Sequence, residues 1–189
     1  MDETCLIYSA RQGDLEAFNC LVLAYQDLVF QHALWMLGEP DLAEAVTQEI
    51  FLLAYRELRS FQGEDIRIWL LRIADRLCLE EIRRREQGRT SPREVGSNGG
   101  VKVEATFQVT GLACSPEGNP GQNVLEKIVR EGLKELSLDL RAVITLVDLQ
   151  GMDYPQTAEI LGISGGSVKR RLARARMRLR DTLFAPSRL

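Results

Sequence analysis

The stretch that decides the fold is residues 154–180, which read YPQTAEILGISGGSVKRRLARARMRLR. A Tyr-Pro pair opens it, and proline is tolerated at the first position of a helix. Gly162 can end this short helix, and Ser164 can cap the next one. Two helices that cross over a tight turn need a small residue at the crossing, a glycine in the turn and an apolar anchor on the second helix. The spacing supplies all three, in Ala158, Gly162 and Val168.

The second of these helices is almost wholly basic outside its apolar stripe. Seven Lys or Arg residues fall within residues 169–180, which is typical of a nucleic-acid-binding surface; a basic solvated face is the alternative. Long cations near the start of a recognition helix can reach guanine edges, and a glycine-rich N-terminus can approach a phosphate closely. We expect Gly166, Lys169, Arg170, Ala173 and Arg174 to face bases, and Arg171, Arg176, Arg178 and Arg180 to face phosphates.

Three further amphipathic helices are predicted in the N-terminal half. Apolar residues recur at three- and four-residue steps over residues 14–37, about 41–60 and 66–85, which is the helical period. Asp41 is the expected cap of the second helix. Because the joints between the three helices are short, we predict one compact helical domain over residues 1–88.

Residues 89–123 lack the helical period and are rich in glycine and proline, which predicts a long flexible linker. Within it, residues 101–110 alternate apolar and polar side chains with a period of two. This segment is either a strand that pairs outside the chain or, as we favour, an extended tether. Helical periodicity returns over residues 124–189. The predicted fold is therefore all-α, with two small helical domains, the second of which contains the helix-turn-helix.

Charge is strongly segregated along the 189 residues, although the formal net charge is only -3. Residues 1–65 contain 12 acidic and 3 basic residues, whereas residues 66–93 contain 8 basic and 4 acidic ones. Residues 165–189 contain 8 basic residues and one acidic residue. Such segregation predicts separate surfaces for partners of opposite charge, with a protein partner on the acidic segment and DNA on the two basic ones.

Several function classes are disfavoured by the residues that the chain lacks. The single histidine, His32, lies in a helical apolar pattern with no Ser, Cys or carboxylate constellation that marks it as a base, and is predicted to be structural. The four cysteines show no C-x-x-C pair, and no Gly-rich phosphate loop follows a strand-like run. We expect no enzyme activity, no cofactor and no metal. No run of 18 apolar residues or secretory signal is present, so we expect a cytoplasmic protein without membrane insertion.

The order of these parts resembles the extracytoplasmic-function (ECF) group of bacterial RNA polymerase sigma factors. Residues 10–18 are similar to the opening helix of that family, and residues 48–55 to the helix that docks on core polymerase. Residues 69–74 are similar to its promoter-melting helix, and residues 154–176 to the part that reads the −35 element. The resemblance covers nearly the whole chain except the linker.

The resemblance implies a protein that binds core RNA polymerase and promoter DNA and is held inactive by an anti-sigma factor. It implies a loop, residues 60–68, that captures an unstacked −10 base, and a half-exposed Trp69 at the start of the next helix. The implied core contacts are Glu44, Gln48 and Glu49. The implied −10 contacts are Phe61, Trp69, Arg72, Arg76, Arg83, Arg84 and Arg85, and the −35 contacts are Ser167, Lys169, Arg170, Arg171, Arg174, Arg176 and Arg178.

Two departures from the family pattern bear on function, whereas Ser137, in place of a frequent proline, and Gln156-Thr157, in place of an acid and an apolar residue, look tolerable. Ala45 stands where an acid is usual, and Arg76 where an asparagine is common. These departures keep open a sigma-like interaction protein that lacks promoter melting. A stand-alone helix-turn-helix regulator, which binds duplex DNA as a dimer, is the other alternative.

Overall fold

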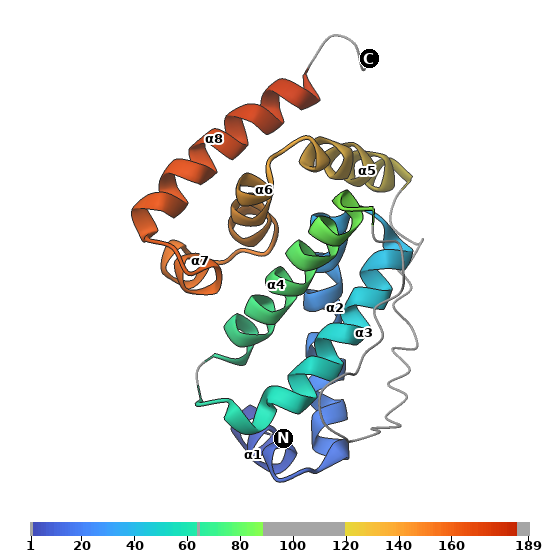
Figure 1. The fold of residues 1–189 in the computed structure, drawn as a ribbon, viewed down its shortest axis with the longest axis vertical. Coiled ribbons are helices and arrows are strands. Elements are labelled where there is room, and N and C mark those ends of the chain that lie inside the picture. Colours follow the sequence, from blue (N-terminus) through green and yellow to red (C-terminus); the bar gives the residue numbers. More distant parts are fainter. Residues whose placement is uncertain (1, 64, 89–119, 185–189) are drawn as a thin grey trace.

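The computed structural model describes residues 2–63, 65–88 and 120–184, and every regular element in these ranges is helical. The N-terminal part comprises α1 (Glu3–Arg11), α2 (Leu15–Leu37), α3 (Pro40–Glu57), the 3-10 turn η1 (Leu58–Ser60) and α4 (Ile66–Glu86). The C-terminal part comprises α5 (Pro120–Lys134), α6 (Leu138–Ile144), the π-helical turn η2 (Thr145–Leu149), α7 (Tyr154–Leu161) and α8 (Gly165–Leu183). The predicted all-α fold with two helical domains is confirmed (Figure 1). The alternating segment 101–110 lies outside the described residues.

The N-terminal domain is built around α2, α3 and α4. Asp14 caps α2 by accepting hydrogen bonds from the backbone N–H groups of Glu16 and Ala17, at 2.9 and 3.2 Å. Gly38 ends α2 in the left-handed conformation, with φ of 78°, which is why the helix stops where the sequence predicted. Large side chains of all three helices are fully buried between them, among them Met36, Ile50, Phe51 and Ile66.

Two local predictions for this domain were wrong. Residues 10–18 do not form one opening helix, because α1 ends at Arg11 and Gly13, with φ of 97°, turns the chain into α2. Asp41 does not cap α3. The helix begins at Pro40 with Glu39 in the cap position, so Asp41 lies in the first turn, where its charge still favours the helix N-terminus.

The C-terminal domain contains the predicted helix-turn-helix. Asp153 and Gln156 form a reciprocal capping box at the start of α7, and Gly162 ends this helix with φ of 63°. Ser164 then caps α8 by accepting from the Ser167 N–H at 3.3 Å. The core beneath is formed by Leu133, Val143, Val168, Leu172 and Ala175. One boundary differs from expectation, since α5 begins at Pro120, four residues before the predicted start of this domain.

The two domains pack against each other, with α7 beside α4 and α5 beside the end of α2 (Figure 1). The contact has an apolar centre, made by Leu28, Ile68 and Leu71 from the first domain and Leu146, Met152 and Ile160 from the second. Helix α2 is long and apolar enough to cross a membrane by length and composition alone, but half of that window is buried in the protein. It is packed as a core helix of the first domain.

Replacing Gly162 by alanine is expected to destabilise the protein by about 1–2 kcal/mol, because an L residue is strained at positive φ. No atom lies within 4 Å of the added Cβ, so only the backbone conformation contributes. Gly166→Ala is the matched control, since this glycine lies inside α8 with equally open space, and alanine there stabilises a helix by up to about 1 kcal/mol. Urea unfolding measures both changes. Equal effects of the two substitutions would contradict this account of the turn.

Candidate nucleic-acid interface

Helix α8 lies at the outer edge of the molecule (Figure 1). Its apolar stripe, which includes Val168 and Leu172, is buried against the rest of the domain. The side chains of Lys169, Arg170, Arg174 and Arg178 are all exposed. Ser167 lies at the helix start, where its hydroxyl accepts a hydrogen bond from Arg170 at 3.2 Å. The predicted base-facing cations are thus gathered on one accessible surface.

Two of the predicted DNA-contacting arginines are held by acidic residues of the same domain. Arg176 donates two hydrogen bonds to Asp148, from Nε at 2.9 Å and from Nη2 at 2.6 Å. These bonds raise the pKa of Arg176. Arg171 forms an ion pair with Asp139 at 3.1 Å. The two pairs connect the middle of α8 to α6, through Asp139, and to the π-helical turn, through Asp148. A π-helical turn is wider than an α-helical one.

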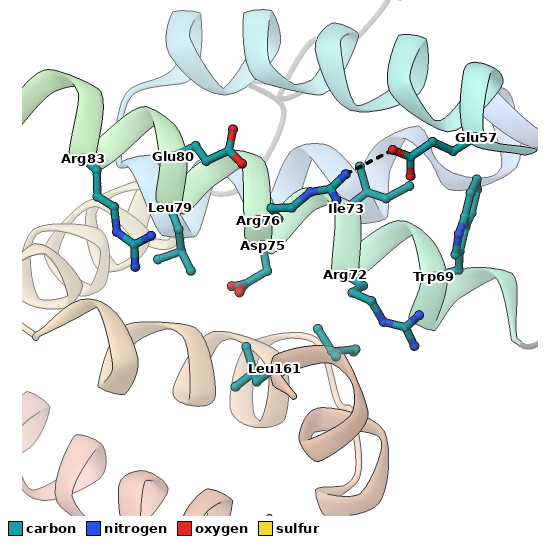
Figure 2. A pocket seen from close by; sticks show the side chains of 11 residues that line it. Glu57, Trp69, Arg72, Ile73, Asp75, Arg76, Leu79, Glu80, Arg83 and Leu161 are labelled. Carbon is teal, nitrogen blue, oxygen red and sulfur yellow. Dashed lines mark hydrogen bonds and ion pairs between the residues drawn. The ribbon is translucent and has the colours of Figure 1, made fainter. Parts of the chain in front are cut away.

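A second basic surface follows α4, beside a groove of about 420 Å³ between α4 and α7 (Figure 2). Arg72 and Arg76 lie along this groove with Arg83. Arg76 pairs with Glu57 at 3.4 Å, and Arg72 pairs with Glu159 of the second domain at 2.9 Å. The cations expected to hold the −10 strand are therefore accompanied by carboxylates in this conformation.

The two aromatic residues predicted at the −10 surface are buried. Phe61 is 2% exposed and Trp69 is 7% exposed, so the expectation of a half-exposed Trp69 was wrong. Their rings meet edge to face with centroids 5.2 Å apart. The cause is the turn η1, after which the Phe61 N–H donates to the Leu58 carbonyl at 3.1 Å and folds the ring over the start of α4. In this conformation the two rings pack on each other, and Trp69 also lines the groove (Figure 2).

The end of α4 is organised by one nearly buried carboxylate. Glu81 accepts hydrogen bonds from Arg84 at 2.8 Å and from Arg85 at 3.1 Å, and Arg85 also reaches Glu39. Burial alone would raise the pKa of Glu81, but the hydrogen bonds and charges of the two arginines outweigh it and lower the pKa. Arg84 and Arg85 are consequently fixed in place rather than free to move, while Arg83 is exposed at the groove.

The predicted core-binding residues share one face of α3. Glu44 is exposed and Gln48 is half-buried one turn later, with Glu49 beside it. Ala45, one of the departures from the family pattern, is also exposed, so it belongs to the surface of α3 and not to the hydrophobic core. This helix lies across α4 from α7 and α8 (Figure 1), so the α3 residues and the basic face of α8 occupy different sides of the molecule.

Sequence comparison agrees with this arrangement. A family described as Sigma-70 region 2 matches residues 21–88, and one described as Sigma-70, region 4 matches residues 126–179. The chain is 33% identical over 178 residues to the ECF RNA polymerase sigma-E factor of Haemophilus influenzae, covering 93% of this chain and 92% of that protein. The chain belongs to the ECF sigma factors. It is also 30% identical to the ECF RNA polymerase sigma factor SigW of Bacillus subtilis, with 94% of both chains covered.

Solved structures show the same fold. The sigma factor is similar to CnrH in complex with the cytosolic domain of CnrY, with a TM-score of 0.70, 23% identity and 96% and 97% of the two chains covered. It is also similar to RpoE in complex with the anti-sigma factor NepR from Bartonella quintana, with a TM-score of 0.64, 24% identity and coverage of 89% and 98%. Family membership gives the function. This sigma factor directs core RNA polymerase to promoters and initiates transcription there.

Residues that sequence reasoning missed are mostly the partners of the basic side chains. No role is predicted from the sequence for Asp139, Arg141, Asp148 or Glu159. The bidentate Arg176–Asp148 pair depends on the π-helical turn, which has no simple sequence pattern. The signal available was Arg141 itself, because an arginine inside the run LDLRAVITLV must find several buried acceptors.

Replacing Glu81 by glutamine is expected to lower the free energy of unfolding by roughly 1–2 kcal/mol at pH 7, because two charge-assisted hydrogen bonds weaken. The loss is no larger because both arginines are partly exposed to solvent, which screens the charges. The pKa of Glu81 is lower in the folded chain than in the unfolded one, so its stabilisation is present above the unfolded pKa and is lost as pH falls through the folded pKa. Urea unfolding at pH 7 and near pH 3 measures the difference. Glu126→Gln, at an exposed site on α5, is the control. A penalty that is equal at both pH values would refute the charge argument.

Proposed function

We propose that the N-terminal domain binds core polymerase through α3 and the −10 element through α4, while α8 reads the −35 element. The observation that carries this assignment is the basic face of α8. Four of its cations are exposed, while the apolar stripe on the other side of the helix is buried in the domain core. Because that face is at the surface of a helix-turn-helix whose caps and turn are all formed, it can enter a major groove without rearrangement of its own domain.

For the −35 element, base reading falls to residues near the start of α8. Arginine can bind guanine with two hydrogen bonds, and lysine can approach the same edge as a point charge. Lys169, Arg170 and Arg174 have this position and exposure. Arg171, Arg176 and Arg178, on the flanks, are assigned to phosphates, which fix the register of the helix on the duplex.

For the −10 element, the α4 arginines are assigned to the backbone of the separated strand. Flipping a base out of the stack costs a few kcal/mol, which contacts to phosphates and to the extruded base must offset. Arg72, Arg76 and Arg83 line the groove, with Arg84 and Arg85 at its end. Phe61 and Trp69 are assigned to the support of the capture loop, since both rings are packed inward.

The remaining assignments concern partners and location. Core polymerase is assigned to Glu44, Gln48 and Glu49 on the acidic side of the molecule, where complementary charge can steer the encounter. An anti-sigma factor is proposed as a further partner, because RpoE, one of the structural neighbours, was solved with one bound. We also propose a cytoplasmic protein with no chemistry of its own. No group of three His, Cys, Asp or Glu that could hold a metal lies in residues 2–63, 65–88 or 120–184.

The proposal is tested by transcription with purified core polymerase and genomic DNA. Run-off products should start at defined promoters, and permanganate should react with unpaired thymines at their −10 regions. Binding of core without permanganate reactivity would instead indicate a sigma-like interaction protein. Binding to a palindromic duplex in the absence of polymerase would indicate a stand-alone regulator.

Replacing Arg174 by alanine is expected to weaken binding to the −35 duplex by about 1–3 kcal/mol and to relax the preference at one position of the element. Fluorescence anisotropy with a set of single-base variants of the duplex measures both effects. Lys127→Ala, which removes an exposed cation from α5, is the control. Weakening that is uniform across all variants would reassign Arg174 to a phosphate.

Replacing Glu44 by arginine is expected to weaken binding to core polymerase about tenfold or more, since a like charge at a complementary surface costs over 1 kcal/mol. Binding of the free sigma factor to the −35 duplex should not change, because Glu44 belongs to α3, which lies across α4 from α8 (Figure 1). Glu16→Arg is the control, an equal charge reversal at an exposed position of α2. If affinity for core polymerase were unchanged in the Glu44 variant but lost in the Glu16 variant, the core-binding surface would lie on α2 and not on α3.

A further inference from the structure

Two polar side chains are buried opposite each other inside the N-terminal domain. His32 of α2 is fully buried and Asp75 of α4 is 5% exposed. The Nε2 atom of His32 lies 3.7 Å from Oδ1 of Asp75, which is too long for a hydrogen bond. Among the residues that the structure describes, neither ring nitrogen of His32 nor Oδ1 of Asp75 has a hydrogen-bond partner. Buried polar groups without partners cost free energy, so stability does not explain this pair.

Asp75 connects the buried pair to the −10 surface of α4. It lines the groove together with Arg72 and Arg76, which are assigned to the −10 strand. Figure 2 shows the Asp75 carboxylate on the same side of α4 as the Arg72 side chain. Because a carboxylate and a phosphate repel each other, the negative charge of Asp75 opposes the approach of a DNA strand to this groove.

The pair can lose its net charge by taking up one proton. Imidazole is the side chain whose charge ordinarily changes between about pH 5 and pH 8. A neighbouring carboxylate favours the charged form of such a ring. Protonated His32 would balance Asp75, so the pair would present no net negative charge beneath the groove.

We propose that His32 and Asp75 form a proton-binding switch, which strengthens −10 binding as the pH falls from about 8 to about 6. The inference rests on the proposed function of α4. Its sign follows from linkage, because a strand that binds better to the protonated pair must in turn favour uptake of the proton. Removing one like charge near a phosphate is expected to raise affinity about threefold to tenfold at the dielectric of a protein surface.

The other charged groups at the groove keep their charge over this pH range. Those beside Asp75 are Glu57 of α3 and Arg72, Arg76, Glu80 and Arg83 of α4, and Glu159 of α7 pairs with Arg72. Carboxylates ordinarily titrate well below this range and guanidinium groups well above it. Cys78, one turn after Asp75, is also buried, and burial raises the pKa of its thiol, which therefore stays neutral.

The surroundings of His32 on α2 contain no second titrating group for this range. Helix α2 has no charged residue between Asp27 and Glu39. The side chains that approach this part of α2 with a charge are Arg130 of α5, over the Trp35 ring, and Arg141 of α6, at the Met36 carbonyl. His32 is also the single histidine of the chain, so one imidazole reports the state of the pair.

Proton uptake is measured on the unmodified chain by NMR with ring-labelled histidine. The resonances of the single imidazole should shift between about pH 6 and pH 8. A saturating single-stranded oligonucleotide, with the −10 region of a promoter found by run-off transcription, should move the midpoint to higher pH. A ring whose resonances do not change over this range, or whose midpoint ignores the bound oligonucleotide, would overturn the proposal.

Two variants test the effect on DNA in the holoenzyme. His32→Leu removes the ring that takes up the proton, so it should bind the −10 oligonucleotide as wild type does at the higher pH and gain nothing at the lower one. Asp75→Asn removes the charge itself, so it should bind at the higher pH as tightly as wild type does at the lower one. Glu126→Gln, the same loss of a carboxylate at an exposed site of α5, is the matched control and should follow wild type.

Core polymerase has titrating groups of its own, so the quantity compared is the ratio of wild-type to variant affinity at each pH, measured by fluorescence anisotropy. The ratio of wild type to His32→Leu should rise at least about threefold at the lower pH. A ratio that is equal at the two pH values would refute the switch and leave the proposed function intact. Failure of the wild-type holoenzyme to bind the oligonucleotide at either pH would contradict the proposed function, and the switch would fall with it. If neither variant folds, the wild-type titration with and without the oligonucleotide decides alone.

Discussion

The structure depends on how one buried guanidinium is satisfied. Arg141 is 7% exposed, its hydrogen-bond acceptors in the described part of the chain are backbone carbonyls, and burial lowers its pKa. Such a group is tolerated inside a protein only when its N–H donors are taken up, and here backbone carbonyls at the ends of α2 and α5 accept them. Because one acceptor, the Met36 carbonyl of α2, belongs to the other domain, this hydrogen bond positions α6 against α2. The π-helical turn, α7 and α8 follow α6 in the chain, so their positions depend on that of α6.

The arginines of the basic surfaces also have partners within the chain. Arginines that are assigned to DNA have carboxylate partners in the isolated chain, as in Arg176 with Asp148, Arg76 with Glu57 and Arg72 with Glu159. Exposed pairs of this kind are worth little each, so phosphates can compete for the arginines at small cost. This explains how a chain with a net charge of -3 can carry two DNA surfaces.

Elements with strong end signals could be predicted from the sequence. Asp14 with Gly38 bounded α2, and Gly162 with Ser164 bounded the turn of the helix-turn-helix, because caps and left-handed glycines act locally. The exposure of Trp69 could not be predicted, since it depends on where the 3-10 turn places Phe61. The acidic partners of α8 could not be predicted either. They come from residues that are distant in sequence, and only the tertiary fold brings them to the helix.

The packing of the two domains did have a sequence signal, which lay in α4. The stripe of Leu70, Ile73, Ala74 and Leu77 accounts for the face of α4 toward its own domain. Ile68 and Leu71 lie off that stripe, and a helix that is apolar on a second face requires a second partner. Ile160 of α7, with Leu146 and Met152, provides it. Separation of the domains would expose both side chains to water, so the burial of Ile68 and Leu71 favours the packed arrangement of the two domains.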